Sequence, residues 1–236
     1  MELYGKTDIG LIRNTNQDAF RFGSFEDGAI WMGDGMGGAN GGDVASDIAV
    51  KSVSCELVSA YCAGMDTAAL QGLLAATIGK ANASIFAASQ ENKTLRGMGT
   101  TIVAAVVVNG SYYIAYAGDS RAYLVQQEIG RQLTTDHSMV QEMVDNGDLT
   151  EQEAKFHPHK NIITRVLGVN PDIKVDYREA CLESGDILLL CTDGLTNYVD
   201  EEIIKGIWEV YHSWIDQQIS DYNTDFYYQP RDYIAA

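Results

Sequence analysis

The sequence lacks any run of about 18 apolar residues, the length that a membrane-spanning helix requires. Its first residues, MELYGKTDIG, have neither the basic nor the apolar region of a secretory signal. The four cysteines form no C-x-x-C pair and no His cluster accompanies them, which favours reduced thiols over a disulfide framework or a zinc site. We therefore expect a cytoplasmic protein. The cysteines are Cys55, Cys62, Cys181 and Cys191.

Positive charge is also scarce. Sixteen Lys and Arg residues stand against 33 Asp and Glu residues, for a net charge of −17. Such a surface repels nucleic acid and anionic membranes, so we expect neither as a partner. It would also repel phosphorylated substrates, unless cations lie where those substrates bind.

The chain does contain enough apolar residues for a sizeable core, at 46% of 236 residues. Its first half predicts strands, two long helices separated near Ala63-Gly64, and a hairpin that turns at Asn109-Gly110. The expected strands cover residues 2–10, 18–25, 28–34, 100–108 and 111–117, and the helices lie within residues 43–92.

The second half alternates in a similar way. We expect strands at 121–126, near 132, at 173–177 and at 186–191, and helices around 140–144, at 150–157 and from 200 to about 219. Thr150 is a candidate helix cap, and Asp200 is another. No linker or internal repeat is evident. The pattern favours one α+β domain, residues 1–236, with mainly antiparallel sheets.

Three apolar strands of this pattern end in an aspartate with glycine beside it: Asp34 in "IWMGDG", Asp119 in "YAGDS" and Asp193 in "LLLCTDG". Carboxylates that meet in space repel one another unless protons or cations neutralise them. Oxygen ligands without His or Cys select Mg²⁺ or Mn²⁺. The pattern therefore predicts an all-oxygen site, with more than one metal, suited to phosphate ester hydrolysis.

A plainer alternative is that these are three unrelated turns, because Asp-Gly is a common turn signal. Even as part of a metal site, the Asp34-Gly35 pair is expected to form a turn. Arg13, five residues before Asp18, is a candidate phosphate ligand, since a guanidinium contacts phosphate oxygens through two parallel bonds. A lone arginine is more often an ordinary surface residue.

At this point the ordered motifs resemble those of a known family, the bacterial branch of the metal-dependent type-2C protein phosphatases. The resemblance spans roughly residues 5–200, and the order of six motifs makes it specific. The motifs are "R-x-x-N-Q-D" (13–18), "DGMGG" with "G-x-V-A-S" (34–46), "MGTT" (98–101), "GDSR" (118–121), "DHS" (136–138) and "TDGL" (192–195).

The resemblance implies a four-layer α-β-β-α sandwich of two antiparallel sheets flanked by helices. It implies hydrolysis of phosphoserine and phosphothreonine in proteins by a metal-bridging hydroxide. The cofactors would be two Mn²⁺ or Mg²⁺ ions, with a third in bacterial members. The residues from about 145 to 167 resemble the flap beside the site, and we call them the flap segment.

Residue by residue, the resemblance implies that Asp34 bridges two metals, that the Gly35 carbonyl binds one of them, and that Asp193 binds the other. Asp18 resembles the acid that acts through a water molecule. Asp119, with Asp193, resembles the third-metal site, and Arg13 resembles the phosphate-binding arginine.

The resemblance weakens in the tail, residues 220–236. The family ends with a motif like "GG-x-D-N-I-T-V", whereas this chain has "PRDYIA", with Tyr233 and Ala235 in place of Asn and Thr. Asp232 is carried over as the last metal ligand, and Asp221 is a weaker competitor. No general acid is assigned; His137 and His157 are candidates by position alone.

Three hypotheses follow. The first is an active phosphatase of phosphorylated proteins, monomeric and opposed by a cognate Ser/Thr kinase. The second is a catalytically weak or non-catalytic regulatory or binding module with the same fold, which the altered tail favours. The third is a metal-dependent hydrolase of small phosphate esters.

Overall fold

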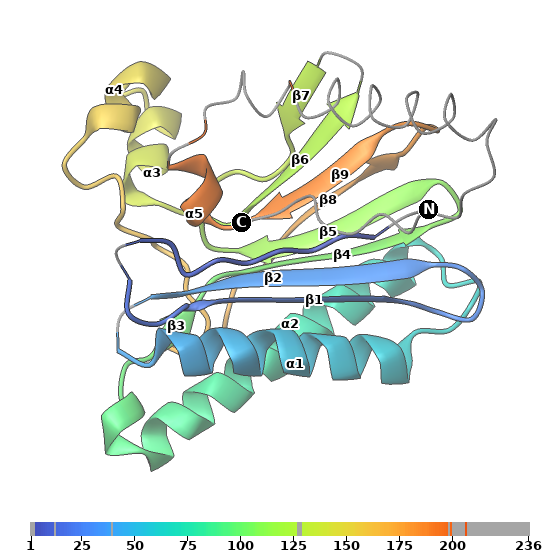
Figure 1. The fold of residues 1–236 in the computed structure, drawn as a ribbon, viewed down its shortest axis with the longest axis horizontal. Coiled ribbons are helices and arrows are strands. Elements are labelled where there is room, and N and C mark those ends of the chain that lie inside the picture. The colour runs from blue at the N-terminus through green and yellow to red at the C-terminus, as the bar shows by residue number, and fades with distance from the viewer. Residues whose placement is uncertain are drawn as a thin grey trace.

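A computed structural model of the chain describes residues 3–11, 13–38, 40–126, 129–197, 199 and 206. In this part of the chain the strands form two antiparallel sheets (Figure 1). The strands are β1 (Asp18–Ser24), β2 (Ile30–Gly38), β3 (Gly99–Thr100), β4 (Ile102–Val108), β5 (Ser111–Ala117), β6 (Arg121–Gln126), β7 (Ile129–Gln132), β8 (Asp176–Cys181) and β9 (Ile187–Cys191). The helices are α1 (Gly42–Ala60), α2 (Thr67–Glu91), the 3₁₀ turn η1 (Lys93–Leu95), α3 (Met139–Asp145), α4 (Glu151–Phe156) and α5 (Asp193–Thr196).

The sheets differ in size and stack face to face. The large sheet has the strand order β1-β2-β4-β5-β8, with β3 paired to β2, and the small sheet has the order β7-β6-β9. In Figure 1 the small sheet lies above the large one, and α1 and α2 cover the lower face of the large sheet. Two antiparallel sheets with helices, the predicted fold class, are confirmed, with one outer helical layer among the described residues.

Strand β4 shows why the apolar run "IVAAVVV" forms the centre of the molecule. Alternate side chains of a strand point to opposite faces. Ile102, Ala104 and Val106 pack in the cluster that includes α1 and α2, while Val103 and Ala105 pack in the cluster between the two sheets. Both faces of β4 are therefore buried, which explains a continuous apolar run in place of alternation.

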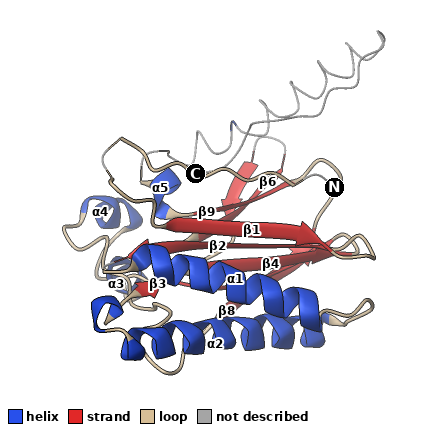
Figure 2. Ribbon diagram, turned by 60° about the horizontal axis from the view of Figure 1, so that its bottom comes forward, coloured by secondary structure: helices blue, strands red, loops and turns tan. Residues whose placement is uncertain are grey.

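The two long helices begin and end close to the predicted positions, with the break between Ala60 and Thr67 (Figure 2). The Asp66 carboxylate accepts a hydrogen bond from the Ala69 N–H at 2.8 Å and caps α2. Thr150 caps α4 as predicted, in a reciprocal arrangement with the Glu153 side chain.

The predicted hairpin is confirmed. Strands β4 and β5 pair from Val108 with Ser111, across Asn109 and Gly110. Both turn residues have positive φ, 51° and 71°. That conformation matches the twist of the flanking strands and favours Asn-Gly.

One predicted strand is wrong, and another has different bounds. Residues 3–9, within the segment expected to pair as a first strand, have no regular structure. The strand expected at 173–177 begins at Asp176 instead. Strand β8 pairs with β5 from Asp176, opposite Tyr116, to Cys181, opposite Ser111, and β5 ends at Ala117, so no partner remains for residues 173–175. Ile173 is apolar because it packs against the helix-side core, not because it pairs in a sheet.

The helix predicted from Asp200 to about residue 219 lies outside the described residues, as does the tail at 220–236. Within the described part of the chain, no helix is both long and apolar enough to cross a membrane.

The helix–sheet core gives a first prediction. Leu57 of α1 is fully buried, whereas the next residue, Val58, is 59% exposed. Replacing Leu57 with Ala leaves a cavity and should lower the free energy of unfolding by about 2–5 kcal/mol in urea titrations. Val58→Ala, the matched control on the same helix, should change it by less than about 0.5 kcal/mol. Equal effects of the two substitutions would contradict the packing described here.

Candidate functional site

The three acid-terminated strands bring their aspartates to one end of the sandwich. Asp34 lies on β2. Asp119 lies in the short connection between β5 and β6, and Asp193 is the first residue of α5, after β9. Asp18, the first residue of β1, joins them. In Figure 1 this is the end that carries α3, α4 and α5. The acids therefore come from both sheets.

Asp34 is the most enclosed of these groups, with 8% of the residue exposed. The pKa of Asp34 is raised to about 8, mainly by burial and also by the nearby Asp18 charge, and only a hydrogen bond from the Gly35 backbone opposes the shift. Its Oδ2 atom is buried and has no hydrogen-bond partner among the described residues. Buried polar atoms normally have partners, so an unpaired carboxylate oxygen calls for a ligand.

The expected turn at Asp34-Gly35 is wrong. Strand β2 continues through both residues to Gly38, and Gly35 pairs with Ala19 of β1. Gly35 is required for space: a Cβ atom there would lie 2.9 Å from the Thr101 carbonyl oxygen. Close approach of the β3–β4 backbone, not a change of chain direction, accounts for this glycine.

Asp119 lies in the connection from the large to the small sheet. The pKa of Asp119 is raised to about 7, mainly by burial and also by the charges of Asp193 and Asp136, against a backbone hydrogen bond and the Arg121 charge. Its Oδ1 atom is the second buried carboxylate oxygen without a partner in the described chain. Gly118, beside it, has a φ of +117°, and a Cβ atom there would lie 2.4 Å from the Thr101 side chain.

Asp18 begins β1 of the large sheet, Asp193 follows β9 of the small sheet, and their charges interact. Burial raises the pKa of Asp18; the Thr192 hydroxyl, which donates to its Oδ2 at 3.0 Å, lowers it, and the Asp193 charge raises it. Burial likewise raises the pKa of Asp193, against a hydrogen bond from Asn197 at 2.8 Å. All four carboxylates thus have raised pKa values and influence one another.

Three cations lower the pKa values of these acids: Arg13, Lys160 and Arg121, the last of which acts on Asp119 and Asp193. The Arg13 charge lowers the pKa of both Asp18 and Asp193, although burial dominates each shift. Arg13 is exposed and its Nη1 donates to Gln17 Oε1 at 3.4 Å. Lys160, in the flap segment, also lowers the pKa of Asp193. The sequence carried no signal for Lys160, because a single lysine belongs to no motif.

The donor set fits hard divalent cations. Two buried carboxylate oxygens lack partners, and the surrounding acids supply oxygen ligands only. Among the described residues, however, no three Asp, Glu, His or Cys side chains are grouped closely enough to hold one ion by themselves. Asp232 and Asp221, the tail candidates, lie outside the described residues.

The "MGTT" motif has a role that sequence analysis left unassigned. The Thr101 hydroxyl accepts from the Met36 N–H at 3.1 Å and lies 2.7 Å from the Ser120 hydroxyl. The Thr100 hydroxyl donates to the Met36 carbonyl at 2.9 Å. These bonds join the strand of Asp34 to the turn of Asp119, so the motif sets the separation of the two acids.

The "GDSR" and "DHS" motifs are joined by an ion pair. Arg121 donates through Nε and Nη2 to the Asp136 carboxylate, at 2.9 and 2.7 Å. Burial alone would lower the pKa of Arg121, but Asp136 raises it, so this guanidinium remains charged. Such paired bonds fix orientation as well as charge.

Neither histidine candidate has the features of a general acid. His137 is buried, and its Nδ1 accepts from the Gly118 N–H at 3.0 Å, while its Nε2 lies 3.1 Å from Asp176 Oδ2. Burial lowers the pKa of His137. His157 follows α4, and its Nδ1 accepts from the His159 N–H at 3.2 Å.

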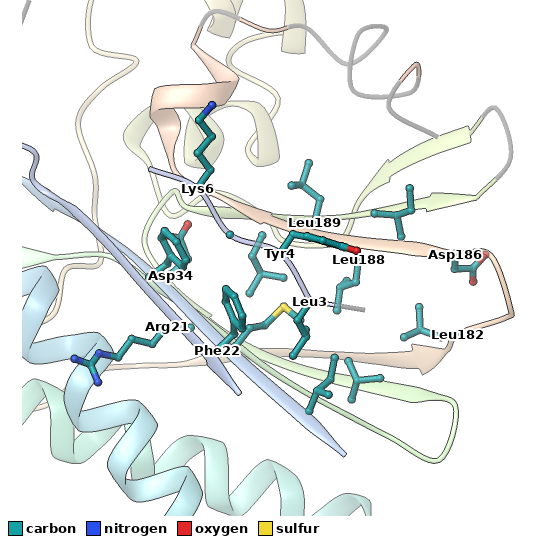
Figure 3. A pocket seen from close by; sticks show the side chains of 18 of the residues that line it. Leu3, Tyr4, Lys6, Arg21, Phe22, Asp34, Leu182, Asp186, Leu188 and Leu189 are labelled. Atoms are coloured by element: carbon teal, nitrogen blue, oxygen red, sulfur yellow. The ribbon is translucent and has the colours of Figure 1, made fainter. Parts of the chain in front are cut away.

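A cavity of about 500 Å³ lies between the sheets, with Asp34 and Lys6 at one end and Asp186 at the other (Figure 3). Apolar side chains such as Phe22 and Leu188 form much of its wall. An apolar wall beside Asp34 is consistent with the cost of charging that carboxyl group.

Comparison with known proteins gives a consistent result. The family model for protein phosphatase 2C matches residues 13–225, which end before Asp232. A serine/threonine phosphatase, stp, from Listeria monocytogenes is 41% identical over 209 residues, covering 85% of this chain and 82% of the relative. Protein phosphatase PhpP from Streptococcus pneumoniae is 38% identical over 210 residues, covering 88% and 84%.

The fold is similar to that of solved bacterial structures. The crystal structure of the serine/threonine phosphatase Stp1 from Staphylococcus aureus matches with a TM-score of 0.79 at 31% identity, over 94% of this chain and 92% of that one.

The turn that holds Asp119 yields a second prediction. Gly118→Ala adds a Cβ where φ is positive and where Thr101 already occupies the space, so both strain and overpacking should destabilise the fold by about 2–5 kcal/mol. Gly64→Ala is the matched control, since Gly64 also has a positive φ, 84°, but no atom lies within 4 Å of the added Cβ. It should cost only about 1–2 kcal/mol. Chemical denaturation of both variants tests this; equal losses would contradict the close packing of Gly118.

Proposed function

The chain belongs to the protein phosphatase 2C family, a metal-dependent family, and we propose that it hydrolyses phosphoserine and phosphothreonine in proteins. The observation that carries this proposal is the pair of buried, unpartnered oxygens on Asp34 and Asp119, within a group of four interacting carboxyls. Relatives named as serine/threonine phosphatases supply the substrate class.

We propose Mn²⁺ or Mg²⁺ as the cofactor, as two ions with a third beside Asp119. The candidate ligands are all oxygen atoms, which suits hard cations. Asp34 would hold two ions jointly, the Gly35 carbonyl would contact one, and Asp193 would hold the other. Asp18 would act through water, and Asp232 would complete the set from the tail. When bound, such ions activate water and neutralise phosphoryl oxygens.

The protein's own residues have defined tasks in this scheme. Arg13 is exposed, its charge acts on Asp18 and Asp193, and it would bind the phosphate of the substrate through its planar guanidinium. Asp34 lies on a strand that pairs with β1 on one side and β4 on the other, so its backbone would stay fixed during the reaction. Thr192 would orient Asp18 through its hydroxyl.

A covalent cysteine mechanism receives no support. The pKa of Cys191 is raised to about 12, mainly by burial and also by the Asp34 charge. A thiol rather than a thiolate is a poor nucleophile. The other three cysteines are exposed and free. Water is therefore the proposed nucleophile.

Other features follow from the same proposal. We propose that residues 1–236 act as one phosphatase domain, monomeric, with the flap segment beside the site. The substrates would be phosphorylated proteins, opposed by a Ser/Thr kinase. Free cysteines suit a reducing compartment, and we propose the cytoplasm.

Hydrolysis assays separate the competing functions. With Mn²⁺, the protein should release phosphate from a phosphothreonine peptide and hydrolyse p-nitrophenyl phosphate. Asp34→Asn should lower kcat/KM by more than about 100-fold, since even indirect partners of a metal site cost about 10–100-fold. The exposed Asp172→Asn serves as a control and should leave activity unchanged.

Three outcomes would contradict parts of the proposal. No Mn²⁺-dependent turnover of either substrate would leave the non-catalytic module as the better account. Turnover of p-nitrophenyl phosphate alone would favour a hydrolase of small esters. Full activity of Asp232→Asn would remove Asp232 from the metal site.

A further inference from the structure

His137 joins the turn of Asp119 to strand β8. Its ring stacks on Tyr116, with ring centroids 5.2 Å apart and planes 6° from parallel. Since Nδ1 accepts the Gly118 N–H, the proton of the neutral ring lies on Nε2, which faces Asp176 Oδ2 at 3.1 Å. Both ring nitrogens are therefore used in holding the structure together.

Arg165, from the end of the flap segment, reaches the same point. Its Nη1 donates to Asp176 Oδ1 at 2.9 Å. It also lies 2.9 Å from His137 Nε2, but both of these nitrogens carry protons, so the carboxylate of Asp176 is the acceptor for each. The carboxylate of Asp176 thus contacts the histidine through one oxygen and the arginine through the other. The ion pair is about one-quarter to one-third exposed, so solvent screens it only in part.

Backbone bonds place the end of the flap segment against the same residues. The Thr164 N–H donates to the His137 carbonyl at 2.8 Å, and the His137 N–H donates to the Gly118 carbonyl at 3.0 Å. Leu167 and Thr100 exchange two further backbone bonds. The end of the flap segment, residue 137 and the turn of Asp119 therefore form one connected unit.

We propose that His137, Asp176 and Arg165 are positioning residues, which fix the end of the flap segment against the Gly118–Asp119 turn and so align the flap for phosphoprotein substrates. This inference rests on the proposed function. A phosphopeptide is long enough to contact the flap, whereas p-nitrophenyl phosphate is small. Loss of the network should therefore affect the first substrate much more than the second.

A double-mutant cycle tests the network. Arg165→Ala and Asp176→Asn should each lower kcat/KM for a phosphothreonine peptide about 10-fold, and the double variant should lose no more than either single variant. All three should retain p-nitrophenyl phosphate hydrolysis within about 2-fold. Arg165→Lys, which keeps the charge facing Asp176, should recover part of the peptide activity.

Lys174→Ala is the matched control, because Lys174 is an exposed cation two residues before Asp176. It should change neither substrate's kcat/KM. Amide hydrogen exchange of residues 157–168, measured without metal or substrate, should be faster in Arg165→Ala and Asp176→Asn than in the wild type or Lys174→Ala. This readout does not depend on catalysis, so it tests the network even if the proposed function fails.

Three results would overturn the proposal. A loss of peptide activity in Arg165→Ala but not in Asp176→Asn would mean that Arg165 contacts the substrate directly. Equal losses for both substrates, together with a lower Tm, would mean a structural role alone. Unchanged hydrogen exchange in both variants would mean that the network does not hold the flap segment.

Discussion

The repulsion between carboxylates at one end of the sandwich is the constraint on which the rest of the structure depends. Asp34 is buried beside Asp18, and Asp119 is buried beside Asp193, with pKa values raised above the ordinary range. In the absence of cations this arrangement costs free energy, because burial and like charge both oppose ionisation. Cation binding must displace the retained protons, so affinity should rise as the pH rises through those pKa values of about 7 and 8.

The fold meets this constraint by building the acids into rigid elements. Asp34 is held within a strand that has neighbours on both sides, not on a loop. The Thr101 hydroxyl ties that strand to the turn of Asp119 through Met36 and Ser120. Strand β4 packs against the helices on one face and against the small sheet on the other, and this packing fixes the position of the large sheet relative to the small one. Carboxylates that would otherwise move apart are thereby kept near one another.

The sequence predicted much of this arrangement, because strand periodicity, caps and the Asn-Gly turn are local signals. It predicted that Asp34, Asp119 and Asp193 would share one end of the fold. It was wrong about the turn at Asp34-Gly35. There the glycine is needed because the carbonyl of Thr101, 66 residues away in the chain, leaves no space for a Cβ atom. The contacts of Arg121 with Asp136, and of Arg165 with Asp176, were likewise not predictable, since they depend on tertiary contacts that no local pattern encodes.

The central claim is that these carboxylates form a site for divalent cations. Calorimetric titration of Mn²⁺ into the metal-free protein at neutral pH tests it most directly. The account predicts saturable binding of at least two ions per chain, and weaker binding with fewer ions in Asp34→Asn. Absence of saturable binding, or identical binding by the wild type and Asp34→Asn, would contradict it.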